Sequence, residues 1–134
     1  MLYTIKETRE ALKSGKTTSV QLVKEAVDTF EKDKSASIPL NAFIELYDDA
    51  IEHAQACDKE IADAKAAGTL EDLFAKKPLL GIPFANKDNI NSKGHRLTWA
   101  SKILQSYVAP YNATVINRLE AAGAIALGRC NQDE

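Results

Sequence analysis

The fold is decided by the stretch LLGIPFANKDN, residues Leu79–Asn89, in which an apolar run leads directly into four polar residues. Proline has no backbone N–H to donate to a sheet, so we predict that a central strand begins near Pro83. This strand ends in the polar segment 86–89, which contains Lys87 and Asp88. The end of the strand is therefore the first candidate for a functional site.

The chain after this strand predicts a second, parallel strand. Residues 94–110 are irregular in pattern, and Asn112 or Thr114 can cap a helix that Gly123 ends. The apolar run Ala124–Leu127 then indicates a short buried strand. A strand, a connection that contains a helix and another strand form a βαβ unit, which we expect to be parallel and right-handed.

Two capping boxes predict a helical hairpin over about residues 1–36. In a capping box, a Ser or Thr hydroxyl and a Glu or Gln side chain three residues later satisfy each other's backbone amides. The box Thr4–Glu7 begins a first helix that Gly15 ends. The box Thr18–Gln21 begins a second helix, which closes in the charged run 31–34.

The start of an α/β core is predicted over about residues 40–134. Residues 41–46 carry strand-forming side chains and predict a short strand. Asp48 or Asp49 can cap the next helix, which runs to about Ala67 and stops at Gly68. We predict a polar connection over Thr69–Pro78.

The predicted sheet looks incomplete as a domain. Two or three strands cannot form a covered parallel sheet, because both faces and both edges need partners. The last residues, Arg129–Glu134, follow directly from a buried-type strand. We therefore expect residues 1–134 to be the N-terminal portion of a single domain.

Composition excludes several classes of function. The chain has 134 residues, with 17 lysines and arginines against 19 aspartates and glutamates, and the net charge of −2 gives no basic surface for nucleic acid. Apolar runs are far shorter than the roughly 20 residues that cross a bilayer. Lys6, Glu7 and Arg9 lie where a signal peptide would need apolar residues. We expect a cytoplasmic protein.

The two cysteines, Cys57 and Cys130, form no C-x-x-C motif, and we expect reduced, partly buried thiols. His53 and Cys57 share metal-ligand spacing on one helix face, but no second pair completes a site, so no bound metal is predicted. From its spacing alone, Lys87 is more typical of a lysine on a solvated turn, as most lysines are, than of a catalytic residue.

Several motifs occur in an order that resembles the amidase signature family. Residues 81–89, GIPFANKDN, are similar to the family's G-I-P-x-x-x-K-D motif. Further similar segments cover nearly the whole chain from Thr4 onward: LNAFI at 40–44, TWASKIL at 98–104, YNATV at 111–115 with the following helix and AGA turn, and GRCNQDE at 128–134. In the last segment, Arg129 and Cys130 replace the family's usual Lys and Thr.

This resemblance implies a mixed sheet flanked by helices that carries a Ser–cis-Ser–Lys amide hydrolase. Lys87 would be the general base, with Asp88 and Ser101 in structural roles. An amine acts as a base only when it is neutral, so a catalytic lysine must lose its proton well below the usual lysine pKa of about 10.4. Desolvation against an apolar wall favours the neutral form, and residues 79–85 could supply that wall.

Within the family, the pattern is most similar to the A subunits of glutamyl-tRNA(Gln) amidotransferases. The similarity implies hydrolysis of glutamine and transfer of the ammonia to a B subunit, which converts Glu-tRNA(Gln) to Gln-tRNA(Gln) with ATP and Mg²⁺. A C subunit would hold A and B together, and tRNA would bind through the partner. No cofactor is expected in this chain.

The family's serine- and glycine-rich stretch of the Gly-Gly-Ser-Ser-Gly-Gly type does not occur in these 134 residues. We therefore expect this chain to be inactive by itself. Three alternatives stay open: another amidase-signature enzyme for small amides, a non-catalytic truncated docking module, and an interrupted reading frame.

Overall fold

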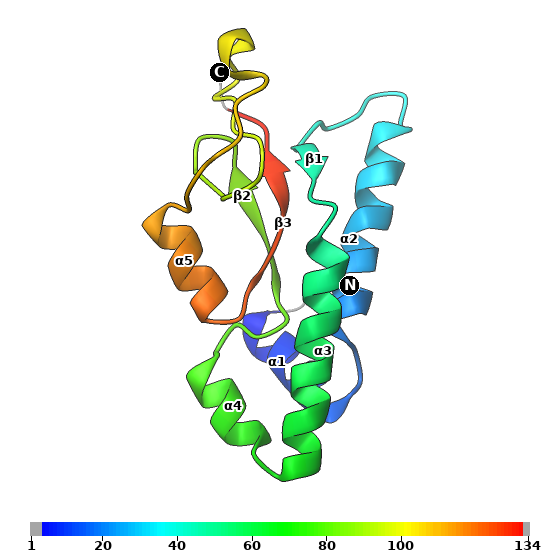
Figure 1. Cartoon of the computed structure of the whole chain (residues 1–134). Helices are drawn as coiled ribbons and strands as arrows, with labels where there is room; N and C mark the ends of the chain where they lie inside the picture. Colours follow the sequence, from blue (N-terminus) through cyan, green and yellow to red (C-terminus); the bar gives the residue numbers. More distant parts are fainter. Residues whose placement is uncertain (1–3, 133–134) are drawn as a thin grey trace.

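Residues 4–132 are described by a computed structural model, and they form a mixed α/β fold (Figure 1). The elements follow in the order α1 (Ile5–Ser14), α2 (Ser19–Lys34), β1 (Phe43–Leu46), α3 (Ala50–Ala67), α4 (Leu70–Lys76), β2 (Pro83–Lys87), the 3₁₀ helix η1 (Lys102–Leu104), α5 (Thr114–Ala121) and β3 (Ile125–Cys130). No helix within residues 4–132 is long and apolar enough to cross a membrane.

Both predicted capping boxes form. The Thr4 hydroxyl accepts from the Glu7 backbone N–H, and the Glu7 carboxylate accepts from the Thr4 N–H at 2.8 Å. Thr18 and Gln21 repeat this arrangement at the start of α2. After the short turn from α1, α2 packs along α3 (Figure 1). The predicted helices are confirmed, and α3 is the main helical partner of α2.

The three strands form one sheet in the order β1-β3-β2. The predicted parallel pairing of β2 with β3 is confirmed, and β1 pairs with β3 antiparallel. The prediction that the strand beginning at Pro83 is central is wrong within the described residues, because β3 lies between the other two. The first five residues of β3 are buried, whereas β2 has one strand partner and an exposed Ala85. Proline has no backbone N–H, so at the start of an edge strand it causes no loss of a hydrogen bond to a neighbouring strand.

The predicted polar connection over Thr69–Pro78 is wrong, because α4 lies within it. Phe74 is fully buried and packs with Leu12, Ile61 and Leu80. The physical reason is a helical spacing: Leu70, Leu73 and Phe74 fall at i, i+3 and i+4, so one turn of helix brings all three to the same face.

Two predicted side-chain caps are also absent. Asp49 precedes α3 but makes no capping hydrogen bond, and one of its carboxylate oxygens lies 3.5 Å from His95 Nε2. Ala113 precedes α5, and Asn112 instead accepts from the Lys93 backbone N–H at 2.6 Å. Both side chains are engaged with the loop that follows β2, so tertiary contacts replace the local cap.

The core consists of two apolar clusters, and α3 contributes residues to both. The first joins α2 and α3 to β3 through Val23, Ala54 and Leu127. The second lies around Phe74 and Leu80. The start of α2 is fixed to α3 by Asp58, whose carboxylate accepts from the backbone N–H groups of Ser19 and Val20 at 2.6 and 3.1 Å.

Candidate active site

The carboxyl ends of β2 and β3 lie side by side and carry the candidate site. Lys87 is the last residue of β2 and pairs in register with Cys130 at the end of β3. The Asp88 N–H donates to the Cys130 carbonyl at 3.2 Å, and the Ile90 N–H donates to the Lys87 carbonyl at 3.0 Å. Half-buried Lys87 is thus held between a parallel ladder and a tight turn.

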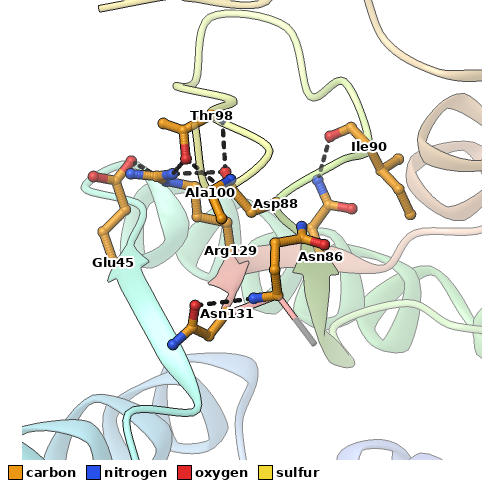
Figure 2. Close-up of polar contacts among 9 residues, drawn as sticks. Glu45, Asn86, Asp88, Ile90, Thr98, Ala100, Arg129 and Asn131 are labelled. Atoms are coloured by element: carbon orange, nitrogen blue, oxygen red, sulfur yellow. Dashed lines mark hydrogen bonds and ion pairs between the residues drawn. The ribbon is translucent and has the colours of Figure 1, made fainter. Parts of the chain in front are cut away.

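Asp88 is the centre of a buried polar network (Figure 2). Only 1% of its surface is exposed. Its carboxylate accepts from the backbone N–H groups of Thr98 and Ala100 at 3.0 and 3.3 Å, and from the Thr98 hydroxyl. It also accepts from Arg129 Nη1 at 2.6 Å. Burial would raise the pKa of Asp88, but hydrogen bonds from Thr98, Arg129 and Ala100 outweigh it and lower the pKa below its usual value.

Arg129 joins all three strands of the sheet. It lies on the middle strand, is 5% exposed, and reaches Asp88 just beyond β2. Its Nε lies 2.9 Å from Glu45 Oε1 on β1 (Figure 2). Burial would lower the pKa of Arg129, but the carboxylates of Glu45 and Asp88 raise it, so the guanidinium stays charged. Sequence reasoning identifies Arg129 only as a charge-conserving replacement, although a single charge at the end of an apolar strand is a signal for a buried partner.

The loop after β2 wraps around Asp88 in a strained conformation. Trp99 and Ala100 both have positive φ, 51° and 53°, which side chains with a Cβ rarely adopt. The Trp99 N–H donates to the Asp88 carbonyl at 3.1 Å, while the Ala100 N–H donates to its carboxylate. Ser101 continues this turn, with its N–H donating to the Thr98 carbonyl at 2.7 Å. Ser101 therefore lies beside the Asp88 network, and its structural role stays a prediction.

Asn86 and Lys87 are the last two residues of β2, so their side chains lie on opposite faces of the sheet. Arg129 pairs in register with Asn86 and contacts Asp88 from that face. Asn86 shares the Asp88 face: it is 3% exposed and donates to the Ile90 carbonyl at 3.0 Å. Lys87 shares the other face with Cys130. Burial raises the pKa of the Cys130 thiol, while the positive charge of Lys87 acts in the opposite direction. The amine and the buried carboxylate are thus neighbours in sequence but are separated by the backbone.

Both cysteines are free thiols and half-buried, as expected. Within residues 4–132, no group of three or more His, Cys, Asp or Glu side chains is arranged to hold a metal ion. A hollow of about 590 Å³ lies in the loop region after Lys87, with walls that include Asn89, Trp99 and Tyr111.

The amidase family model matches residues 25–134, which include the β2 end, the wrapped loop and β3. The chain belongs to the amidase family. It is 45% identical over 131 residues to the A subunit of the glutamyl-tRNA(Gln) amidotransferase of Treponema denticola, a match that covers 98% of this chain and 26% of that protein. It is 44% identical over 133 residues to the corresponding A subunit of Lacticaseibacillus paracasei, covering 97% of this chain and 24% of that protein.

Solved amidase structures share the fold. The native peptide amidase of Stenotrophomonas maltophilia superposes with a TM-score of 0.80 at 29% identity, covering 95% of this chain and 24% of that one. An amidase family protein of Bacillus anthracis gives a TM-score of 0.82 at 25% identity, covering 96% and 24%. The predicted family and fold class are confirmed, and the chain spans about a quarter of the length of these relatives.

Proposed function

We propose that this chain contributes the lysine of a Ser–cis-Ser–Lys amidase that releases ammonia from glutamine. The observation that carries the proposal is the position of Lys87: it ends a strand in the matched segment, half-buried, on the face opposite the Asp88 carboxylate. Serine is a poor nucleophile without a base, and a neutral amine can take its proton. The two serines would come from a stretch of the Gly-Gly-Ser-Ser-Gly-Gly type, which these 134 residues lack.

The proposed substrate and partners follow from the similarity to the amidotransferase A subunits. Identities of 44–45% over almost the whole chain support assembly with B and C subunits. In this assembly, the B subunit uses ATP with Mg²⁺ and the ammonia to convert Glu-tRNA(Gln) to Gln-tRNA(Gln), and it supplies the tRNA contacts. The chain of 134 residues by itself is proposed to be inactive, since it has neither the nucleophile nor the oxyanion donors, one of which can be worth about 2.7–4 kcal/mol.

A chimera tests this proposal. Residues 1–134 replace the matching quarter of the Treponema denticola A subunit, and the chimera is combined with the B and C subunits of that organism. We expect Gln-tRNA(Gln) formation that depends on glutamine and ATP. A chimera that hydrolyses a simple amide without B and C, but never amidates Glu-tRNA(Gln), would favour the alternative of a small-amide hydrolase, which the similarity to the peptide amidase supports. A chimera that folds and binds B and C without any amide hydrolysis would favour the docking module.

A further inference from the structure

The exposed apolar side chains gather in one segment of the chain. Of the ten large apolar side chains that are exposed within residues 4–132, six lie between residues 99 and 115: Trp99, Ile103, Tyr107, Val108, Tyr111 and Val115. We call these six side chains the 99–115 patch. They lie on the segment that connects β2 to α5 and on α5 itself (Figure 1). A folded domain rarely exposes so many apolar side chains in one place unless something binds there.

Part of the patch forms the wall of the hollow of about 590 Å³ that follows β2. Its members in this wall are Trp99, Tyr107, Tyr111 and Val115. Backbone hydrogen bonds close the segment around the hollow: the Leu97 N–H donates to the Tyr107 carbonyl at 3.2 Å, and the Ala113 N–H donates to the Asn91 carbonyl at 2.9 Å. The Asp88 network holds Trp99 in its strained conformation. Such strain persists only where the surrounding structure fixes it, so the hollow is formed before any partner binds.

The segment that carries the patch is basic, although the net charge of the whole chain is −2. Residues 89–119 contain four lysines and arginines and no aspartate or glutamate. The next residue, Glu120, is engaged locally, because its carboxylate accepts from Asn112 Nδ2 at 2.9 Å. A local excess of positive charge around an apolar hollow favours a partner that is apolar at its centre and acidic at its edge.

Three of the four basic residues lie next to the wall of the hollow. Lys93 is exposed, and its N–H donates to Asn112, whose two neighbours in the chain both line the hollow. Lys102 is exposed at the start of η1, and the last residue of η1 lines the hollow. Arg118 is exposed on α5 three residues after Val115, on the same side of the helix. We call these three residues the basic rim.

The length of the relatives indicates what covers this surface. The chain matches 26% of the Treponema denticola A subunit and 24% of the peptide amidase, so most of such a domain packs against this quarter. We propose that the 99–115 patch and the basic rim are the docking surface for the remaining three-quarters of an amidase domain, which places apolar side chains in the hollow and acidic side chains against the rim. Because the hollow is already formed, it also binds that part as a separate polypeptide. This inference rests on membership of the family and not on the role of Lys87.

The experiment produces the full chain, residues 1–134, together with the part of the Treponema denticola A subunit that it does not match, as two separate polypeptides. Sedimentation measures their association, and we expect a one-to-one complex. Lys93→Glu combined with Lys102→Glu should weaken this complex at least about tenfold, because like charges would then face each other across the interface. The matched control, Lys24→Glu combined with Lys32→Glu, alters two exposed lysines of α2 and should leave the affinity unchanged.

A second measurement does not require the separate part to fold by itself. Hydroxyl-radical oxidation of Trp99 and Tyr111 is compared between the chain and the chimera described above. We expect both side chains to lose most of their reactivity in the chimera. Equal reactivity in the two proteins, a complex that the Lys93 and Lys102 changes leave unaffected, or protection of Trp99 by a second copy of the chain would overturn the proposal. A complex that releases no ammonia would contradict the proposed function and leave this inference intact.

Discussion

Gly123 lies in the turn between α5 and β3, and replacing it with alanine tests how closely two parts of the core approach. Its φ is +89°, and a Cβ added there would lie 2.7 Å from Leu80 Cα and 3.1 Å from Leu80 Cβ. The backbone cannot easily retreat, because the Gly81 N–H donates to the Gly123 carbonyl at 2.9 Å and the Leu79 N–H to the Ala122 carbonyl at 2.9 Å.

Two costs add at this position. An L-residue in the left-handed region costs about 1–2 kcal/mol. Forcing a packed backbone to move costs about 1–3 kcal/mol more. Gly94 is the matched control: its φ is +84°, but an added Cβ meets nothing within 4 Å, so Gly94→Ala should cost only the first amount.

The assay is urea unfolding of the full chain followed by circular dichroism, with equal slopes as the check on two-state behaviour. We expect Gly123→Ala to lower the free energy of unfolding by about 1–3 kcal/mol more than Gly94→Ala does. Equal losses for the two variants would refute the close approach of the α5–β3 turn to Leu80.

The remaining predictions concern three other contacts. Phe74→Ala should cost about 3–5 kcal/mol, because it empties a fully buried site, while Ile38→Ala, at an 87% exposed position, should change stability by less than about 0.5 kcal/mol in the same urea assay. The pKa of Asp88 is lowered in the folded chain, so the ionised carboxylate contributes fully to the free energy of unfolding above the unfolded pKa of about 3.9, and this contribution is lost as the pH falls through the folded pKa. Asp88→Asn should therefore flatten the acid side of a curve of stability against pH. An unchanged acid side would contradict this. Asp58→Ala should cost about 1–2 kcal/mol of stability, because it leaves two backbone amides at the start of α2 without their acceptor. The control Asp63→Ala removes only an exposed ion pair with Lys59 and should cost less than about 0.5 kcal/mol. Equal urea midpoints for the two variants would contradict the role of Asp58.

Features that depend on neighbouring residues could be predicted from the sequence. The capping boxes at Thr4 and Thr18 form because both partners lie within one helical turn. The helix ends at Gly15 and Gly68 follow from a left-handed conformation that glycine adopts without strain. Pro83 marks the start of β2 because proline, which has no backbone N–H, is tolerated at the first residue of a strand.

Features that depend on distant partners could not be predicted in this way. α4 has only seven residues, too few for its helical spacing to stand out, and the burial of Phe74 requires Leu12 and Ile61 from other helices. The order of strands in a sheet cannot be read from neighbouring residues in the sequence. The apolar run before Lys87 therefore wrongly predicts that β2 is the middle strand of the described sheet, whereas β3 lies in the middle. Arg129 could be suspected of a buried partner, but Glu45 and Asp88 become its partners only when three strands assemble.

The central claim is that Lys87 supplies the base for amide hydrolysis. The most direct measurement is ammonia release from glutamine by the chimera described above, assembled with B and C, with Lys87→Met compared against Lys102→Met, which alters an exposed lysine of η1. We predict that Lys87→Met lowers the rate by at least about a hundredfold, the scale of general-base catalysis, while Lys102→Met leaves it unchanged. Hydrolysis by the Lys87→Met chimera at the rate of the unmodified chimera would contradict the account.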